Sequence, residues 1–309
     1  MHVSLRALLT GMIDYAGLFP PAQLPLEEAL RNDAAYRQGS DAWMLGRFVC
    51  PSTSLSQLMS YPPLSVVGRG GKDLKEFLIG LRDDLGSMLA LRGNRPAASI
   101  ETYEVRLCGE LLTADSAKNL RTVLYGSDDL LASGGVVLES SFYEVEYKAD
   151  WFGTIGFLIG ALIESPDRKK GLKIRCGGGS AAAVPSVDDL AFGMVACRKT
   201  GIPVKFTAGL HHPLRRDDKA LGAKTHGFLN VFVAGVLCHA RGLELEAVQA
   251  ILEDEDPHHF RFDDTEMWWK DLHATTEEVR VARSRFVTSF GSCSFDEPRE
   301  DLRALRLMD

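Results

Sequence analysis

Charged side chains interrupt four stretches of the sequence that otherwise have the composition of buried β-strands. The stretches are residues 98–105, 136–141, 172–176 and 203–208, and their charges include Glu101, Glu139, Lys173, Arg175 and Lys205. A lysine amine that loses its proton can attack a carbonyl carbon, and a nearby carboxylate can move protons for carbon–carbon cleavage or enolisation. These residue types indicate carbonyl chemistry if the strands bring them together.

Strand alternation predicts which of these side chains share a face, because successive residues of a strand point in opposite directions. In 172–176 the apolar residues alternate with Lys173 and Arg175, and in 203–208 they alternate with Lys205 and Thr207. If the apolar residues pack against helices, all four polar side chains point into the interior of a barrel. A lysine beside another cation in a partly desolvated barrel also loses its proton more easily.

The two acidic stretches follow the same rule. Placing Ile100 and Leu138 against the helices directs four side chains inward, namely Glu101, Tyr103, Glu139 and Ser141. Unpaired buried charges cost several kcal/mol, so these groups must pair, meet water or meet a ligand. The slight excess of cations favours a substrate with a carboxylate or phosphate group. The structural alternative is an ion-pair network that fills the barrel, or charges solvated at its mouth.

Glycines follow the sixth predicted strand at the edge where barrel active sites lie. The run is Gly177, Gly178, Gly179 and Ser180. Successive backbone amides in such a run can converge on a phosphate or carboxylate. A plain flexible loop is the alternative.

Histidines and an aspartate occupy the same edge. His211 and His212 follow the seventh strand, Asp14 ends the first, and His226 opens a later helix where it could overhang the site. Adjacent histidines on extended backbone point in opposite directions, so one metal ion would take only one of them. We therefore expect His211 either to act as an acid or base or to bind a divalent metal with Glu139, Glu101 or Asp14 as an oxygen ligand. Packing, capping and loop closure are the structural alternatives for these residues.

The elements that must position these residues alternate between short β-rich runs and helical segments. Predicted strands cover 12–16, 43–49, 65–68, 98–105, 136–141, 172–176, 203–208 and 260–264, and predicted helices cover 25–37, 54–60, 73–91, 116–125, 151–164, 186–200, 227–240, 244–252 and 275–290. Eight β-then-α units predict a (βα)₈ barrel of the TIM type. We predict one domain over residues 1–309, with 291–309 as a carboxyl-terminal tail. An open doubly wound sheet is the alternative, but no GxGxxG follows the first strand.

Composition excludes several classes of protein. The 309 residues carry a net charge of −7, so no overall positive field attracts nucleic acid or an anionic membrane. The most apolar stretch, 151–163, is shorter than the ~20 residues of a membrane span. Six dispersed cysteines without a CxxC pair, and an amino end without the long apolar core of a secretory signal, lead us to expect a cytoplasmic protein with reduced thiols.

Parts of the sequence resemble two known families. Lys205-Phe206-Thr207-Ala208-Gly209 resembles the Lys-x-Ser/Thr-x-Gly motif of class I aldolases of the deoxyribose-phosphate aldolase kind, whereas 173–177 shares only the lysine and glycine because Arg175 replaces the hydroxyl residue. This resemblance implies a barrel in which Lys173 forms an imine and Lys205 lowers its pKa. Residues 13–22 (IDYAGLFPPA) and 205–213 (KFTAGLHHP) also resemble signatures of a bacterial and plant family, which implies no activity.

Three hypotheses follow. The first is an aldolase-like lyase or an isomerase that acts on a small anionic carbonyl compound through Lys173 or Lys205, with no cofactor. The second is a metal-dependent lyase, isomerase or hydrolase that uses His211 with carboxylates. The third is a barrel that binds a small anion without catalysis. All three exclude nucleic-acid and membrane partners and are compatible with a homo-oligomer.

Overall fold

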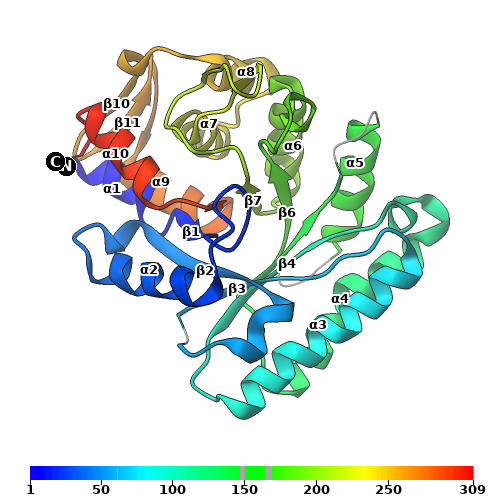
Figure 1. Ribbon diagram of the computed structural model, residues 1–309. Coiled ribbons are helices and arrows are strands. Elements are labelled where there is room, and N and C mark those ends of the chain that lie inside the picture. Colours follow the sequence, from blue (N-terminus) through cyan, green and yellow to red (C-terminus); the bar gives the residue numbers. More distant parts are fainter. Residues whose placement is uncertain (61, 147–149, 165–168, 309) are drawn as a thin grey trace.

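The computed structural model describes residues 1–60, 62–146, 150–164 and 169–308, and its centre is a closed barrel of eight parallel strands (Figure 1). The strand order around the barrel is β1, β13, β7, β6, β5, β4, β3, β2. The strands are β1 (Ile13–Tyr15), β2 (Leu45–Pro51), β3 (Leu64–Val67), β4 (Ile100–Arg106), β5 (Ser140–Glu144), β6 (Lys170–Arg175), β7 (Val204–Thr207) and β13 (Val287–Ser292). The predicted single-domain (βα)₈ fold is confirmed.

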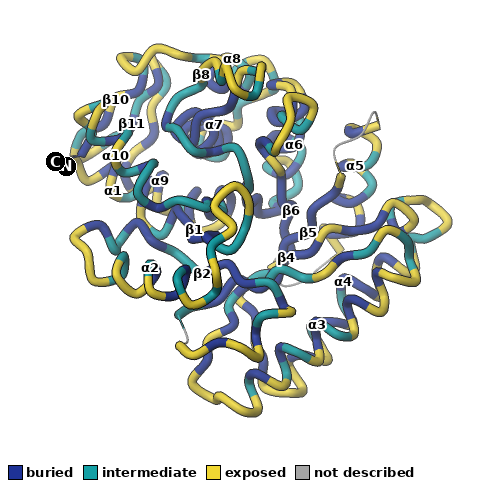
Figure 2. Tube along the Cα trace, in the orientation of Figure 1, coloured by how far each residue is buried: buried dark blue, intermediate teal, exposed yellow. Residues whose placement is uncertain are grey.

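Helices surround the barrel, and the strands between them are buried (Figure 2). They are α1 (Val3–Leu9), α2 (Leu26–Gln38), α3 (Leu74–Asn94), α4 (Ala117–Ser133), α5 (Trp151–Leu162), α6 (Val187–Thr200), α7 (Phe228–Arg241), α8 (Leu245–Glu253), α9 (Thr276–Arg285) and α10 (Asp296–Ala304). The helix predicted at 54–60 is instead a 3-10 segment, Ser52–Gln57. Within the described residues, no helix combines the length and the apolar character needed to span a bilayer.

Helix α6 shows how local sequence sets these boundaries. The Ser186 hydroxyl accepts from the backbone N–H of Asp189, and the Asp189 carboxylate accepts from the backbone of Ser186, which forms a capping box. Gly201 ends the helix with φ 71°, a left-handed conformation that glycine adopts without steric cost. The position of α6 fixes the exit of the chain into β7 and therefore the place of Lys205.

The predicted eighth strand is wrong. Residues 260–262 form β10 (Phe260–Phe262), which pairs antiparallel with β11 (Glu266–Trp269) in a separate sheet that β12 (Leu272–Thr275) completes. The arginine between the two buried phenylalanines of β10 is exposed, a one-sided pattern typical of an antiparallel strand. The eighth barrel strand is β13, whose residues are buried on both faces or nearly so.

The same error affects the end of the chain. The helix predicted over 275–290 ends at Arg285, and the remainder enters β13. The segment 291–309, expected to be a tail, contains the last residues of β13 and helix α10. A small hairpin of β8 (Arg216–Asp218) and β9 (Ala223–Thr225) lies between β7 and α7. All six cysteines are free thiols, and five of them are buried.

Candidate active site

Two buried lysines on neighbouring strands share one carboxylate inside the barrel. Lys173 of β6 and Lys205 of β7 are register partners and are 6% and 1% exposed. The Lys173 Nζ lies 2.8 Å from Oε2 of Glu104, and the Lys205 Nζ lies 3.1 Å from Oε1 of the same group. Glu104, on β4, therefore bridges the two ammonium groups across the barrel interior.

Asp14 of β1 contacts Lys205, which is the more buried of the two lysines. Lys205 forms an ion pair with Asp14, which is fully buried. Ser289 of β13 donates a hydrogen bond of 2.8 Å to Asp14 Oδ2, and the backbone N–H of Arg47 donates one of 2.7 Å to Oδ1. Both carboxylate oxygens of Asp14 therefore accept hydrogen bonds, and these bonds hold the carboxylate in position beside Lys205.

Lys173 contacts a residue at the carboxyl end of a neighbouring strand. Its Nζ is 3.2 Å from Oε2 of Glu144, the last residue of β5. Arg175, two residues further along β6, reaches Glu144 at 3.5 Å and keeps 43% of its side chain exposed. Lys173 is therefore the lysine that contacts the carboxyl end of β5, and the half-exposed guanidinium of Arg175 contacts the same carboxylate.

The charges inside the barrel shift the pKa values of Glu104 and Lys173. Burial alone would raise the pKa of Glu104, but the ammonium groups of Lys173 and Lys205 outweigh it and lower that pKa to about 2. Burial alone would lower the pKa of Lys173, but Glu104 and Glu144 outweigh it and raise that pKa. The expectation of a readily deprotonated Lys173 is therefore wrong for the resting site, because two carboxylates face this amine as well as the second cation.

The shifted pKa of Glu104 predicts an acid-dependent loss of stability. A carboxyl group whose pKa is lowered on folding stabilises the protein above its unfolded pKa, about 4.5, and loses that contribution as the pH falls toward 2. We expect the free energy of unfolding of the wild type, relative to Glu104→Gln, to fall by roughly 3 kcal/mol between pH 5 and pH 2. Denaturant titrations at stepped pH measure this difference. The exposed Glu27→Gln is the control, and parallel curves for wild type and Glu104→Gln would contradict the assignment.

The predicted inward residues of β4 are wrong by one position. The pairing of β3 with β4 shifts between Leu64 and Ser65, since Leu64 pairs with Ile100 but Ser65 pairs with Thr102. The extra residue, Glu101, reverses the alternation after it, as a β-bulge does. Thr102 and Glu104 therefore share the inward face with Ser65, whose hydroxyl donates to Glu104. Tyr103 points outward and donates a hydrogen bond of 3.0 Å to Asp84 of α3.

The predicted inward residues of β5 are also wrong. The apolar run at 136–138 precedes the strand, which begins at Ser140, so Glu144 rather than Glu139 or Ser141 reaches the lysine cluster. Glu139 and Glu101 lie at the amino end of the barrel, where Arg47 binds both at 2.6 and 2.9 Å. The sequence signal that could have identified Glu144 is its charge directly after the two aromatic residues Phe142 and Tyr143.

The glycine loop after β6 packs against the loop after β7. A Cβ on Gly177 would lie 2.8 Å from Cα of Gly209, so only glycine permits this approach. None of Gly177, Gly178 and Gly179 adopts the left-handed backbone that an alternating amide nest requires. Ser180 is exposed, and Thr207 of β7 is register partner of Arg175. Anion binding by this loop stays a prediction, and Arg175 is its better-placed donor.

Gly209→Ala is expected to destabilise the protein strongly. Gly209 has φ 73°, and its new Cβ would lie 2.7 Å from Cα of Gly177, which is backbone and cannot rotate away. Gly222→Ala is the matched control, because it has φ 70° but nothing within 4 Å of the added atom. We expect a loss of about 1 kcal/mol for Gly222→Ala and at least about 3 kcal/mol for Gly209→Ala in chemical denaturation. Equal losses would show that the close approach contributes nothing.

The rim histidines attach loops to helices. Nδ1 of His211 lies 3.0 Å from Glu297, and Nδ1 of His212 lies 2.6 Å from Asp301, both on α10. His226 is buried, its Nε2 donates to the carbonyl of Pro185 at 2.9 Å, and burial lowers its pKa to about 4. His226 is therefore neutral and joins the start of α7 to the loop before α6.

The structure does not bring the predicted metal ligands together. Glu139 and Glu101 lie at the amino end of the barrel, whereas His211 follows β7 at the carboxyl end and faces Glu297. Across residues 1–60, 62–146, 150–164 and 169–308, no three His, Cys, Asp or Glu side chains are grouped as a metal site would need. The proposed pair of His211 with Glu139 or Glu101 is therefore wrong on geometry.

No protein-family model matches the sequence, and no curated protein matches it. Among solved structures, the chain is similar to the tetrameric deoxyribose phosphate aldolase from Aeropyrum pernix, with a TM-score of 0.49 and 13% sequence identity over 98% of each chain. The strand pairing described above establishes the barrel independently of this similarity.

Proposed function

We propose that this protein is an enzyme that forms an imine between Lys173 and a small anionic carbonyl compound, for aldol-type lyase or isomerase chemistry. The observation that carries the proposal is the bridge of Lys173 and Lys205 by Glu104. Burying two ammonium groups and the carboxylate between them costs desolvation free energy, and active sites are where such clusters with shifted pKa values concentrate.

The geometry supports a complete proton path for imine formation. Glu144, 3.2 Å from the Lys173 Nζ, takes a proton from the ammonium group while Glu104 stays ionised beside it, and the neutral amine adds to the carbonyl carbon. Return of a proton to the new hydroxyl releases water and leaves the iminium. The iminium then accepts the electron pair of an adjacent C–C or C–H bond, which breaks as a proton leaves the hydroxyl of the departing carbonyl fragment or the carbon itself. The resulting enamine is protonated at carbon, and addition of water to the new iminium releases the product and restores Lys173.

Lys205 has a different role in this proposal. It is 1% exposed and bonded to both Asp14 and Glu104, so it has little access to a substrate. Its charge keeps Glu104 ionised and oriented, which makes Lys205 a positioning residue. The exposed guanidinium of Arg175 is the proposed partner of the substrate's carboxylate or phosphate.

Borohydride trapping tests the proposal. The protein is incubated with a panel of small phosphorylated and carboxylated aldehydes and ketones, reduced with borohydride, digested and analysed by mass spectrometry. We expect an adduct on Lys173 that survives prior dialysis against chelator. Lys170 is the internal control, because it is on the same strand and 2% exposed but pairs outward with Asp128. Adducts on Lys205, or equally on Lys170, would overturn the assignment.

A further inference from the structure

A cavity of about 890 Å³ lies at the amino end of the barrel, away from the lysine cluster. Its lining includes residues that immediately precede or begin barrel strands, among them Gly11, Ser140, Pro203 and Thr288. Its volume falls within the range of ~300–1,000 Å³ that is usual for small-molecule sites. The residues proposed for imine chemistry do not line it.

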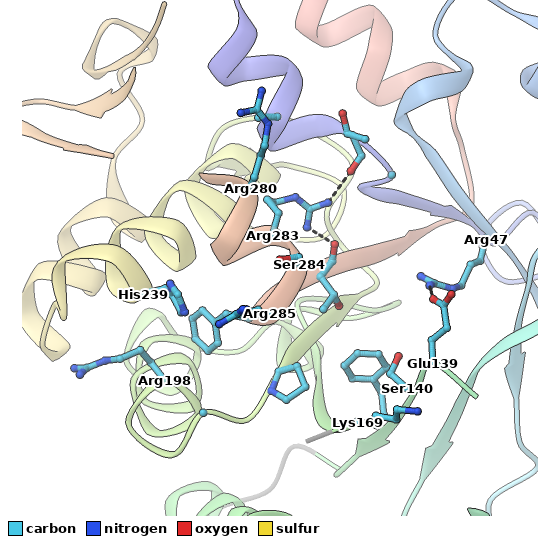
Figure 3. A pocket seen from close by; sticks show the side chains of 18 residues that line it. Arg47, Glu139, Ser140, Lys169, Arg198, His239, Arg280, Arg283, Ser284 and Arg285 are labelled. Atoms are coloured by element: carbon cyan, nitrogen blue, oxygen red, sulfur yellow. Dashed lines mark hydrogen bonds and ion pairs between the residues drawn. The ribbon is translucent and has the colours of Figure 1, made fainter. Parts of the chain in front are cut away.

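The lining is strongly cationic. The cations are Arg47, Lys169, Arg198, Arg280, Arg283 and Arg285, and the only acidic side chain among the lining residues described is Glu139. Figure 3 shows Arg198 and Arg285 on one side, with His239, and Arg47 with Glu139 on the other. This concentration of positive charge occurs in a protein of net charge −7, so it does not reflect the overall composition.

Only part of this charge is neutralised by the protein. Arg47 pairs with Glu101 and Glu139, Arg198 pairs with Glu244, and Arg280 pairs with Glu277 at 3.4 Å. For Arg283 and Arg285, by contrast, the described part of the chain offers no carboxylate within 4 Å.

Burying the guanidinium of Arg283 without a carboxylate partner costs desolvation free energy. Its side chain is 8% exposed and donates only to backbone carbonyls, including those of Leu8 at 2.7 Å and Thr10 at 3.1 Å. Burial lowers its pKa to about 9. The pKa of His239 is also lowered, by burial first and then by the positive charges of Arg285 and Arg198. Asp14 offsets part of the effect of burial on Arg283, and the wall of the cavity carries the charges of Arg283 and Arg285 without a carboxylate partner within 4 Å among the described residues.

We propose that the amino-terminal cavity binds a small, multiply charged anion, phosphate-bearing or polycarboxylic, with Arg280 and Arg285 as its exposed donors. Arg283 forms the buried cationic wall behind them. The cavity is larger than a single inorganic phosphate needs, so the anion is an organic phosphate, a condensed phosphate or a di- or tricarboxylate. This site is independent of the imine chemistry, since it lies at the opposite end of the barrel.

Titration calorimetry of the full chain tests the proposal at constant ionic strength, with pyrophosphate and citrate as the two probes. We expect one site per chain for at least one probe, and the preferred probe distinguishes the phosphate from the carboxylate class. Each charged hydrogen bond lost typically weakens binding by roughly tenfold, so R280Q/R285Q is expected to raise the dissociation constant at least about tenfold. Both residues are exposed, so this variant is expected to fold, which its circular dichroism and melting curve verify.

Two controls that each remove one cation elsewhere in the protein locate the binding. R121Q removes an exposed cation on α4 that does not line the cavity, and R175Q removes the cation at the carboxyl end of the barrel. Neither is expected to change the affinity by more than about twofold. Absence of binding by both probes overturns the proposal. Equal weakening by R121Q, or loss of binding in R175Q with none in R280Q/R285Q, also overturns it. None of these calorimetric outcomes bears on the proposed imine at Lys173, which borohydride trapping of the wild type tests separately.

Discussion

Lys173→Arg is expected to abolish the borohydride-trapped adduct completely while leaving the fold intact. Arginine keeps the positive charge that faces Glu104 and Glu144, so the carboxylates retain a counterion. A guanidinium stays protonated and does not form an imine with a carbonyl compound. Any turnover of a carbonyl compound that labels the wild type is expected to fall by at least about 10³-fold.

The matched control is Lys170→Arg, which changes the other buried lysine of β6. It is expected to leave both the adduct and the turnover unchanged. Unfolding in denaturant verifies that both variants retain a cooperative transition. Persistent trapping in Lys173→Arg would mean that another amine carries the chemistry, and it would remove the basis for the proposed function.

Asp14→Ala is expected to cause the largest loss of stability of any single substitution considered for this protein. Asp14 is fully buried and pairs with Lys205, and it also accepts from Ser289 and the backbone of Arg47. Removing one member of a buried ion pair leaves the other charge without full compensation, which costs about 3–5 kcal/mol. Equilibrium unfolding in guanidinium chloride measures the loss.

A double variant separates the charge effect from a packing effect. Asp14→Ala with Lys205→Met removes both charges, so most of the lost stability is expected to return. A loss below about 1 kcal/mol in Asp14→Ala would show that Glu104 alone satisfies Lys205. If the double variant were as unstable as Asp14→Ala, the cavity left by the carboxylate would account for the loss.

The fold was predictable because a parallel barrel repeats one simple signal. Seven of the eight barrel strands lie at or near predicted runs, and α6 (Val187–Thr200) matches its predicted range of 186–200 to within one residue. The eighth was missed because β13 follows α9 with only Phe286 between them. No glycine or proline marks that change from helix to strand, so periodicity extended the helix through it.

The candidate site was predictable only where alternation was uninterrupted. Lys173 and Lys205 were placed correctly in the interior because the pairing between β6 and β7 runs without a register shift. Glu104 was missed because the bulge at Glu101 reverses the faces of β4, and this bulge depends on pairing with β3, which no local pattern reveals. Ser289 was missed because its strand was missed. The partners of His211 and His212 lie on α10, nearly 90 residues further along the chain.

The position of β13 in the chain has a consequence for biosynthesis. The hydrogen bond between Ser289 and Asp14 joins residues 275 positions apart, and β13 alone closes the gap between β1 and β7. While a ribosome is still adding the intervening residues, β1 and β7 are unsealed edges with unpaired backbone groups, which are prone to pair with other chains. These two edges therefore stay open until Ser292 has been added, and Asp14 lacks its hydrogen bond from Ser289 until the same stage of synthesis.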